Sequence, residues 1–543
     1  MNTETESSAS RLARWSSIGA LAGDRVWRAI ERAVRSRRYV LMCLVSMVLV
    51  RIAWVAWIEV QPTSDFTWYY SQGLRIASGQ GYTVEHTGFP LWESGTPLPT
   101  PRKTAFWPVG YSGFLGVLFY VSQGWLDRLG SPLVIAKLAN VALSVITVWG
   151  TARLSRLWFK SELTERLTLL VAGFAPNQIA YVALTACETY YTALLVLGVL
   201  ALAHAAQPDT RMPTGALPGN IRSLGWALAS GVLFGLATLT KPQTSLLPAA
   251  LLLIWAPWRQ LYASLSRESG AGSVREDCAL EATSPPPLSK HTPAEISSLG
   301  RSSRASEQWT WSARPIRLWL SAGPWLKKAA CVYVPLCLVV LPWSVRNYLA
   351  FGEWVAVSTN GWMNLAIGNM PGSWGNQGLM WNRELHEVVQ RYSDELSWNA
   401  GAKSVFLHYV QQHPLQVIAG IPGKLIALYT WDVDGFGWAR LGDLRKTGES
   451  YYLPLRVLSQ MNYLAAFALA AYAVLHLRRA LTPGIRAALV VIAYFTVLYT
   501  IFFGGPRFHF PVMPFIYMFA AAGLARLISR PGTLERAPTA AAP

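Results

Sequence analysis

Residues 39–59 read YVLMCLVSMVLVRIAWVAWIE and form the first strongly apolar run of a 543-residue chain. A helix needs about 20 mostly apolar residues to cross the hydrocarbon core of a bilayer, and this run has that length. Only 14% of the residues are charged, whereas soluble domains carry about 25%. These features predict an all-α polytopic membrane protein.

Further apolar runs of similar length follow the first one along the chain. Two other apolar stretches, 106–121 and 415–431, are ambiguous, so the prediction is about 10–12 transmembrane helices with juxtamembrane helices in a long first outer loop. The ten predicted spans are 39–59, 132–152, 167–186, 189–206, 223–240, 244–258, 326–343, 453–477, 484–503 and 508–528.

Arginine and lysine, which collect in cytoplasmic loops, set the direction of threading. Residues 1–38 hold eight arginines against four acids, which predicts a cytoplasmic N-terminus. The basic loop after residue 152 also belongs inside, so 106–121 is expected to stay on the outer side, and 415–431 is expected to be an outer interfacial helix. Both termini are then cytoplasmic, in what we expect to be a bacterial inner membrane.

The chain divides into modules by composition. Residues 259–325 are rich in Ser, Pro and Gly and cannot bury enough apolar surface to fold, which predicts a disordered cytoplasmic insertion. The full division is a cytoplasmic basic amphipathic segment 1–38, an N-terminal catalytic transmembrane module 39–258 with outer loop 60–131, the insertion 259–325, a C-terminal transmembrane module 326–528 with outer loop 344–452, and a cytoplasmic tail 529–543.

The net charge of +18 has two possible interpretations. Nucleic-acid binding is one. Cationic loops that fix topology and meet anionic lipid explain the excess better, so membrane lipid is the expected partner and nucleic acid is not. The five cysteines are scattered without metal-type pairing and indicate small core residues.

Charged or titratable side chains gather at the outer ends of the predicted spans, where they are costly unless paired or functional. Two of the cations could instead extend to the interface along their own stems, and the two acids could stabilise helix N-termini. Taken together, they favour a site for an anionic lipid headgroup with a general base beside it. The residues are Asp65, Glu188, Lys241, Arg346, Arg507 and His509.

Other chemistries lack support in the sequence. HExxH, CxxC, GxSxG and P-loop motifs are absent, which argues against zinc proteases, serine hydrolases and ATPases. A transporter or flippase for a lipid-linked saccharide is the alternative reading. That class often shows internal repeats with matching broken helices, and none is visible here.

Several of these stretches resemble the C-type (GT-C) glycosyltransferase superfamily, in particular proteins similar to family 39, to protein O-mannosyltransferases and to lipid A aminoarabinose transferases. The resemblance runs from about residue 40 to 528 outside the insertion. The turn before 110–121 departs from it, because Trp107 and Val109 flank Pro108 where relatives have a double proline, and Glu188 stands where some members have Asp. The motifs are SDFTWYYSQGLRIASGQGY (64–82), KTAFWPVGYSGFLGVLFY (103–120), FAPNQIAYVALTACETYY (174–191), LPWSVRNYLAFGEWVAVSTNGWMNLAIGNMPG (341–372) and FGGPRFHFPVMPF (503–515).

The resemblance implies a transferase that moves a sugar from a polyprenyl-phosphate donor to an acceptor hydroxyl on a glycan, lipid or protein, with inversion. Asp65 is then the general base and Glu188 assists it. Lys241, Arg346, Arg507 and His509 are the candidates for binding the donor phosphate. Weaker candidates for contacts with acceptor or sugar are Tyr69, Tyr111, Asn360 and Asn369. No cofactor is implied with certainty; a divalent metal ion is possible, and its ligands are unknown.

Overall fold

The computed structural model describes residue 34 and residues 36–86, 97–125, 130–207, 221–256, 314–372, 382–478 and 480–529. Of these residues, 79% are helical, and their strands β1 (Thr83–His86) and β2 (Pro97–Lys103) form one antiparallel hairpin. The prediction of an all-α polytopic membrane protein is confirmed. Most of the predicted basic segment 1–38, of the insertion 259–325 and of the tail 529–543 lies outside the described residues.

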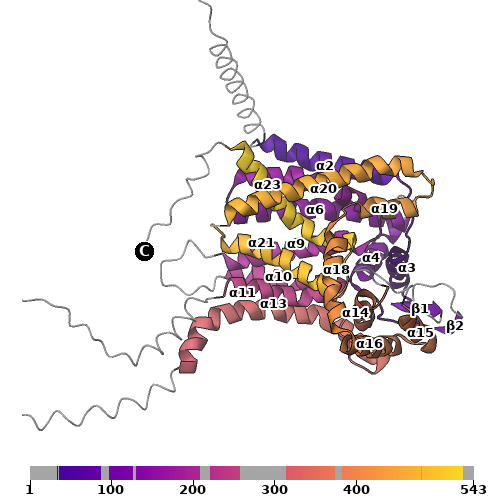
Figure 1. Cartoon of the computed structure of the whole chain (residues 1–543). Helices are drawn as coiled ribbons and strands as arrows, with labels where there is room; N and C mark the ends of the chain where they lie inside the picture. The colour runs from indigo at the N-terminus through magenta and orange to yellow at the C-terminus, as the bar shows by residue number, and fades with distance from the viewer. Residues whose placement is uncertain are drawn as a thin grey trace, which may run out of the picture.

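In the described residues, eight helical segments are long and apolar enough to cross a membrane, and each matches a predicted span. They run side by side as one bundle (Figure 1). The chain is therefore an integral membrane protein. The segments are α2 (Arg37–Trp57), α6 (Pro132–Phe159), α9 (Cys187–Ala206), α10 (Ile221–Thr240), α13 (Arg314–Phe351), α20 (Glu449–Leu477), α21 (Pro483–Ile501) and Pro506–Ile528, which comprises α22 (Pro506–His509), η5 (Phe510–Val512) and α23 (Met513–Ile528).

The predicted span 167–186 is interrupted. It falls on α7 (Glu162–Gly173), α8 (Pro176–Ala180) and η2 (Tyr181–Ala183), because Pro176 cannot continue the hydrogen bonding of α7. The fully buried Arg51 of α2 donates to the carbonyl of Gly173 at 2.9 Å, which places a cation at the C-terminus of α7. The predicted span 244–258 likewise falls on two shorter pieces, η3 (Pro242–Leu246) and α11 (Leu247–Ile254).

The two ambiguous stretches both lie at one end of the bundle, on the right in Figure 1. The first contains α4 (Gly110–Val121), which crosses α3 (Asp65–Ala77) closely: a Cβ on Gly116 would lie 2.5 Å from Cγ2 of Ile76. The second forms α17 (Pro414–Ala419) and α18 (Ile421–Tyr429). Neither stretch crosses the bundle, as the distribution of charge predicts.

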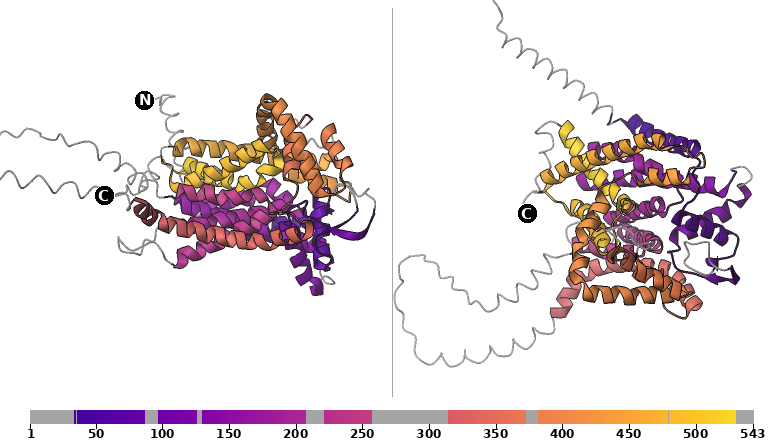
Figure 2. Two further views of the ribbon diagram at one scale, coloured as in Figure 1. Left: turned by 90° about the horizontal axis from the view of Figure 1, so that it is seen from below. Right: turned by 45° about the vertical axis from the view of Figure 1, so that its right-hand side comes forward.

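The same end carries the remaining short elements, which form a layer across the ends of the long helices (Figures 1 and 2). The layer comprises α3, α4, the β1–β2 hairpin, η1 (Gln123–Trp125), α14 (Gly361–Asn369), α15 (Arg383–Arg391), α16 (Glu395–Gln412) and α19 (Asp434–Gly442). Two predicted boundaries shift. Helix α13 begins at Arg314, inside the expected insertion, and continues to Phe351, past the expected start of the outer loop at residue 344.

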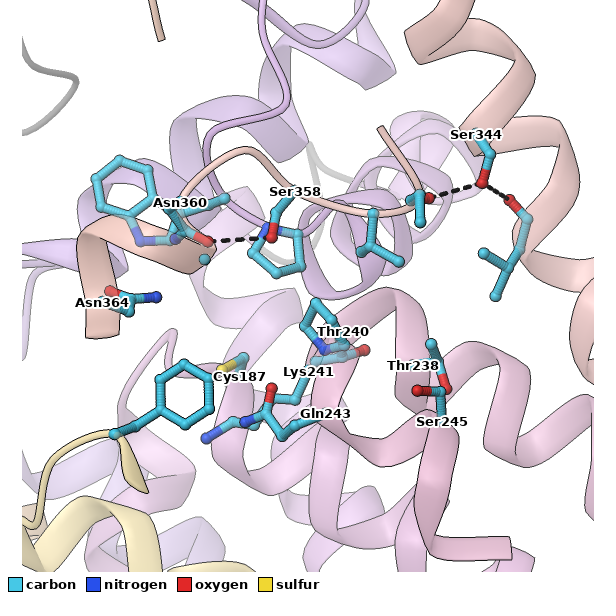
Figure 3. A pocket seen from close by; sticks show the side chains of 18 of the residues that line it. Cys187, Thr238, Thr240, Lys241, Gln243, Ser245, Ser344, Ser358, Asn360 and Asn364 are labelled. Atoms are coloured by element: carbon cyan, nitrogen blue, oxygen red, sulfur yellow. Dashed lines mark hydrogen bonds between the residues drawn. The ribbon is translucent and has the colours of Figure 1, made fainter. Parts of the chain in front are cut away.

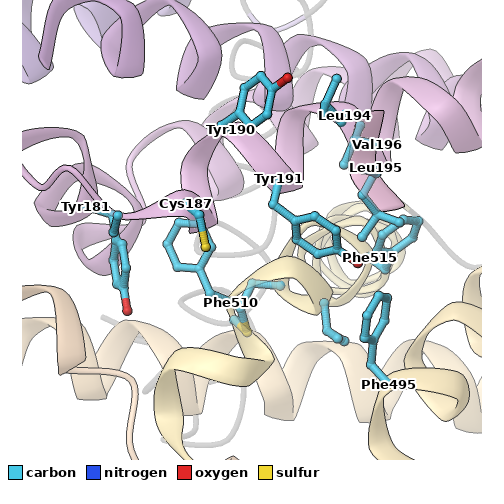
Figure 4. Packing of buried hydrophobic residues seen from close by; sticks show 14 of the residues in the cluster. Tyr181, Cys187, Tyr190, Tyr191, Leu194, Leu195, Val196, Phe495, Phe510 and Phe515 are labelled. Carbon is cyan, nitrogen blue, oxygen red and sulfur yellow. The ribbon is translucent and has the colours of Figure 1, made fainter. Parts of the chain in front are cut away.

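Helix α9 lies at the centre of the bundle and is the most buried of the long helices. Its aromatic and aliphatic side chains pack against those of α21, η5 and α23 (Figure 4). Because α9 is enclosed on all sides, the polar residues of its first turn are held without access to lipid. Glu188 is one of them.

Candidate active site

A cavity of about 760 Å³ lies between the outer layer and the bundle. Its wall combines residues from both transmembrane modules: α3, the turn between α10 and η3, the second half of α13, the loop leading into α14, and the loop between α21 and α22. The sides of the cavity differ in chemistry. Ser358, Asn360 and Asn364 lie on one side, and Cys187, Lys241 and Gln243 lie on the other (Figure 3).

Four of the six charged candidates meet at one end of this cavity. Arg507 donates through Nε to Oε1 of Glu188 at 2.6 Å and through Nη1 to Oδ2 of Asp65 at 2.8 Å. Nζ of Lys241 lies 3.2 Å from the same Oε1 of Glu188. Two carboxylates and two cations leave this cluster, Asp65–Glu188–Lys241–Arg507, without net charge.

The two carboxylates of the cluster differ in access. The Asp65 side chain is 23% exposed and lines the cavity, whereas Glu188 is fully buried and does not line it. Asp65 is therefore placed to reach a substrate. Glu188 lies behind the cations and holds both of them through one oxygen.

The position of Asp65 depends on an unusual turn. Ser64, at the N-cap of α3, has a φ of +53°, a conformation that non-glycine residues rarely adopt and that costs on the order of 1 kcal/mol. This turn starts α3 so that its first residue is Asp65, where the helix dipole favours a negative charge. The ring of Phe66 then lies under the Arg507 guanidinium, 5.2 Å from Cζ.

Tyr69 joins the cavity wall one helical turn after Asp65. Its ring is buried and packs edge-on against the ring of Tyr111, and burial raises the pKa of the Tyr69 phenol well above its usual range. Tyr69 is therefore a neutral hydrogen-bonding group beside the cluster. Tyr111 lies deeper: its hydroxyl is 3.4 Å from Oδ1 of Asn140, and it does not line the cavity.

The structure does not bring Arg346 to the cavity. Its guanidinium donates to the carbonyl oxygens of Tyr82 and Thr104, each at 2.8 Å, and lies over the ring of Trp343. These contacts fasten the end of α13 to both ends of the β1–β2 hairpin. Arg346 therefore holds the outer layer in place.

His509 is also absent from the cavity wall, although Arg507 is only two residues away. It is fully buried, with Nδ1 2.5 Å from the carbonyl oxygen of Leu428 and Nε2 3.2 Å from Oδ1 of Asp432. Its place in the structure is a second polar cluster behind the Arg507 loop.

The two asparagine candidates separate in the same way. Asn360 lines the cavity, and its Oδ1 accepts from Oγ of Ser358 at 3.0 Å. Asn369 instead donates to the carbonyl of Ile501 at 2.9 Å and accepts from Nζ of Lys424, which fastens α14 to the end of α21.

Sequence reasoning missed several residues of the wall. Gln243 lies in η3, Asn364 in α14 and Ser358 in the loop before α14; all three are neutral polar residues, and nothing in their spacing marks them. The apolar wall on α13 could have been found, since its residues recur at helical spacing toward the outer end of a predicted span. Those residues are Leu336, Cys337, Val340 and Leu341.

The cluster does not suit a metal ion shared by its two carboxylates. The guanidinium of Arg507 lies between Asp65 and Glu188 and already supplies their counter-charge. Within the residues that the structure describes, no group of three or more His, Cys, Asp and Glu side chains could hold a metal ion.

No family model and no curated protein matches the chain. Among solved structures, the Archaeoglobus fulgidus oligosaccharyltransferase in its apo form is similar over 91% of this chain and 51% of its own, with 11% identity and a TM-score of 0.47. ArnT from Cupriavidus metallidurans, solved with undecaprenyl phosphate, is similar over 90% and 78%, with 13% identity and a TM-score of 0.36. The chain thus spans about half the length of the archaeal enzyme.

Proposed function

We propose that the chain is a membrane glycosyltransferase that moves a sugar from a polyprenyl-phosphate donor to an acceptor hydroxyl, with inversion. The observation that carries this proposal is the composite wall of the cavity. One part of the wall, which we call the polar end, holds Asp65, Lys241 and Arg507, and another part, which we call the apolar end, holds Leu336, Val340 and Leu341 of α13. A polyprenyl-phosphate sugar has the same division, with an anionic phosphosugar joined to a hydrocarbon chain.

The apolar end suits a chain that stays in the bilayer. Leu336, Val340 and Leu341 of α13 supply its apolar side chains. Each CH₂ group buried there contributes about 0.8 kcal/mol to binding. Leu341 of α13 lines the cavity and is 45% exposed, and we expect the donor to enter along this membrane helix.

The polar end suits the chemistry of a single displacement. The acceptor oxygen forms a bond to the anomeric carbon as its proton passes to the Asp65 carboxylate. The bond between that carbon and the phosphate oxygen breaks, and the electron pair leaves with the polyprenyl phosphate. The negative charge thus moves from Asp65 to the phosphate, and the total charge is unchanged.

Arg507 is placed to follow this movement of charge. In the structure it contacts Asp65 directly, so protonation of Asp65 weakens one of its two ion pairs and leaves its Nη1 available to the leaving phosphate. Lys241, held by Glu188 on the other side, supplies a second cation. Fixed cations of this kind stabilise charge that develops in the transition state.

We infer the location of the reaction from the basic residues of the sequence. The basic residues of 1–38, Arg153 and Arg156 at the C-terminal end of α6, and Arg526 and Arg530 favour cytoplasmic termini, and the cavity would then open at the outer face of a bacterial inner membrane. The N-terminal module 39–258 supplies Asp65, Glu188 and Lys241, and the C-terminal module 326–528 supplies Arg507. The acceptor can be a glycan, a lipid or a protein.

The test is transfer of labelled sugar from synthetic polyprenyl-phosphate sugars by the purified full chain in proteoliposomes. Asp65→Asn should lower the rate about 10²- to 10⁴-fold, the usual contribution of a general base. The matched control is Asp443→Asn, because Asp443 caps the turn after α19 and does not line the cavity. Transfer at the wild-type rate by Asp65→Asn would overturn the role of Asp65. Movement of the donor across the bilayer without transfer by the wild type would instead support a flippase.

A further inference from the structure

His509 has two ring nitrogens, and each faces an oxygen. Nδ1 faces the carbonyl oxygen of Leu428, which can only accept a hydrogen bond, so Nδ1 must carry a proton. Nε2 faces Oδ1 of Asp432. A second hydrogen bond therefore requires a proton either on Nε2 or on the carboxyl group.

The surroundings of Asp432 hold its carboxylate and the imidazole of His509 in place. Oδ1 of Asp432 also accepts a hydrogen bond from Nδ2 of Asn177, so this oxygen already acts as an acceptor. The rings of Tyr429 and Tyr463 stack on the imidazole, with centroids 6.0 and 5.3 Å away. The His509–Asp432 contact is therefore a hydrogen-bonded pair enclosed by two aromatic rings.

The backbone of Asp432 is held as firmly as its side chain. Its carbonyl accepts from Oγ of Ser459 at 2.6 Å, and its N–H donates to Oε1 of Gln460 at 3.0 Å. Both of these partners belong to α20, and Asn177 belongs to α8. The His509–Asp432 pair thus ties the Arg507 loop to two other elements of the bundle.

The loop is also fixed on its other side. Lys424 is buried, and its Nζ donates to the carbonyl of Thr500 at 2.9 Å, at the C-terminus of α21. A Cβ on Gly504 would lie only 2.0 Å from the carbonyl oxygen of Lys424, so α18 and the loop are in direct backbone contact. Arg507 therefore stands between an anchor at Lys424 and an anchor at His509.

We propose that the buried His509–Asp432 pair is a positioning pair for transfer: it fixes the short helix α22 so that Arg507 reaches Asp65 and the donor phosphate together. This inference rests on the proposed function. Neither residue lines the cavity, so the pair acts through Arg507. Misplacing a catalytic group by about 1 Å can cost about 100-fold in rate.

The test is a double-mutant cycle between His509→Gln and Arg507→Ala, read in transfer rate and in the affinity of the purified full chain for polyprenyl monophosphate. His509→Gln alone should lower kcat/KM on the order of 10- to 100-fold. In the Arg507→Ala background it should cause no further loss, because the residue through which it acts is gone. Thermal unfolding should shift by the same amount in both backgrounds.

The control variant is Tyr452→Phe, which removes another buried polar contact, from the Tyr452 hydroxyl to Oδ2 of Asp443 at 3.0 Å. It should lower thermal stability and leave kcat/KM unchanged. If His509→Gln does not fold, Asp432→Asn replaces it in the same cycle. Multiplicative losses in the Arg507→Ala background would overturn the positioning role and leave the proposed function intact. Absence of transfer by the wild type would instead remove the proposed function.

Discussion

Two arginines of this chain were equally good candidates for binding a phosphate, and the structure uses them differently. Arg507 shares its donors between two carboxylates at the edge of a cavity. Arg346 donates to the backbone carbonyls of Tyr82 and Thr104 and to its neighbour Asn347. A carboxylate can exchange a guanidinium with an incoming phosphate, because both are anions that bind the same fork of donors. If Arg346 moved to a phosphate, the buried carbonyls of Tyr82 and Thr104 would be left without a donor, so Arg346 cannot make this exchange.

The difference teaches which charged groups of a membrane protein are available for function. Removing a charge from water at membrane depth costs free energy, which hydrogen-bond partners offset. Arg346 binds fixed backbone carbonyls, whereas Arg507 binds carboxylates that a phosphate can replace. Only the second arrangement leaves the cation ready for a ligand. The four predictions below test this comparison.

The largest effect is expected at Arg507. Arg507→Ala should lower kcat about 10²- to 10³-fold, since it removes a preorganised donor from the developing charge. Arg507→Lys is the matched control: it keeps the charge, cannot contact both carboxylates at once, and should retain intermediate activity. Both are measured as label transferred per minute in proteoliposomes. Equal activities for Ala and Lys would mean that charge at this position does not matter.

The apolar wall should give the next largest effect. Val340→Trp fills the cavity beside α13 and should raise the donor KM at least about tenfold, which equals the loss of roughly two buried CH₂ groups. Leu338 lies on the same helix, is 61% exposed and does not line the cavity. Leu338→Trp should therefore leave the donor KM unchanged. A similar rise for both variants would show that the effect is general to α13.

The two asparagines offer a smaller version of the same contrast. Asn360→Ala removes an amide from the cavity wall and should raise one substrate KM about fivefold, corresponding to one neutral hydrogen bond of about 1 kcal/mol. Asn369→Ala should leave both KM values unchanged and lower the unfolding temperature, since Asn369 binds the backbone of Ile501. Initial rates against donor and acceptor concentration separate the two cases.

The smallest effect on transfer is expected at Arg346. Arg346→Met should keep kcat within about twofold while lowering the free energy of unfolding by about 2–3 kcal/mol, because two carbonyls lose their donor. Thermal unfolding in detergent checks the second part. A hundredfold loss of transfer with unchanged stability would place Arg346 in the site and remove the contrast with Arg507.

Much of the fold follows from the sequence, because apolar length is what a bilayer requires. Eight of the ten predicted spans match long apolar helices, and the charge pattern keeps α4 and α18 at one end. The break at Pro176 was visible in the sequence as a proline inside an apolar run. The start of α13 at Arg314 was not, since its first turns continue a membrane helix into residues of mixed composition.

The sequence predicts the position of the site residues only along the long axis of the bundle. Counting spans assigns each polar residue to an end of the bundle, and all six charged candidates do lie at the same end. The count says nothing about position across that end, so Arg346 and His509 could not be separated from Arg507 in advance. Lys424 and Asp432 carried a usable signal: each is a charge inside or beside an apolar stretch, IPGKLIALYTWD, where such groups need a reason.

The exposure of Leu341 at the wall of the cavity has a consequence for how the proposed transfer must be assayed. The effective concentration of a lipid-linked donor that enters along a membrane helix is its mole fraction in the surrounding lipid. The effective concentration of a polar acceptor is its amount per volume of water. Diluting the proteoliposomes with buffer would lower the concentration of the acceptor and leave the mole fraction of the donor unchanged. Adding empty lipid to the same vesicles would lower the mole fraction of the donor and leave the acceptor concentration unchanged. The apparent KM values for donor and acceptor therefore respond to two independent dilutions.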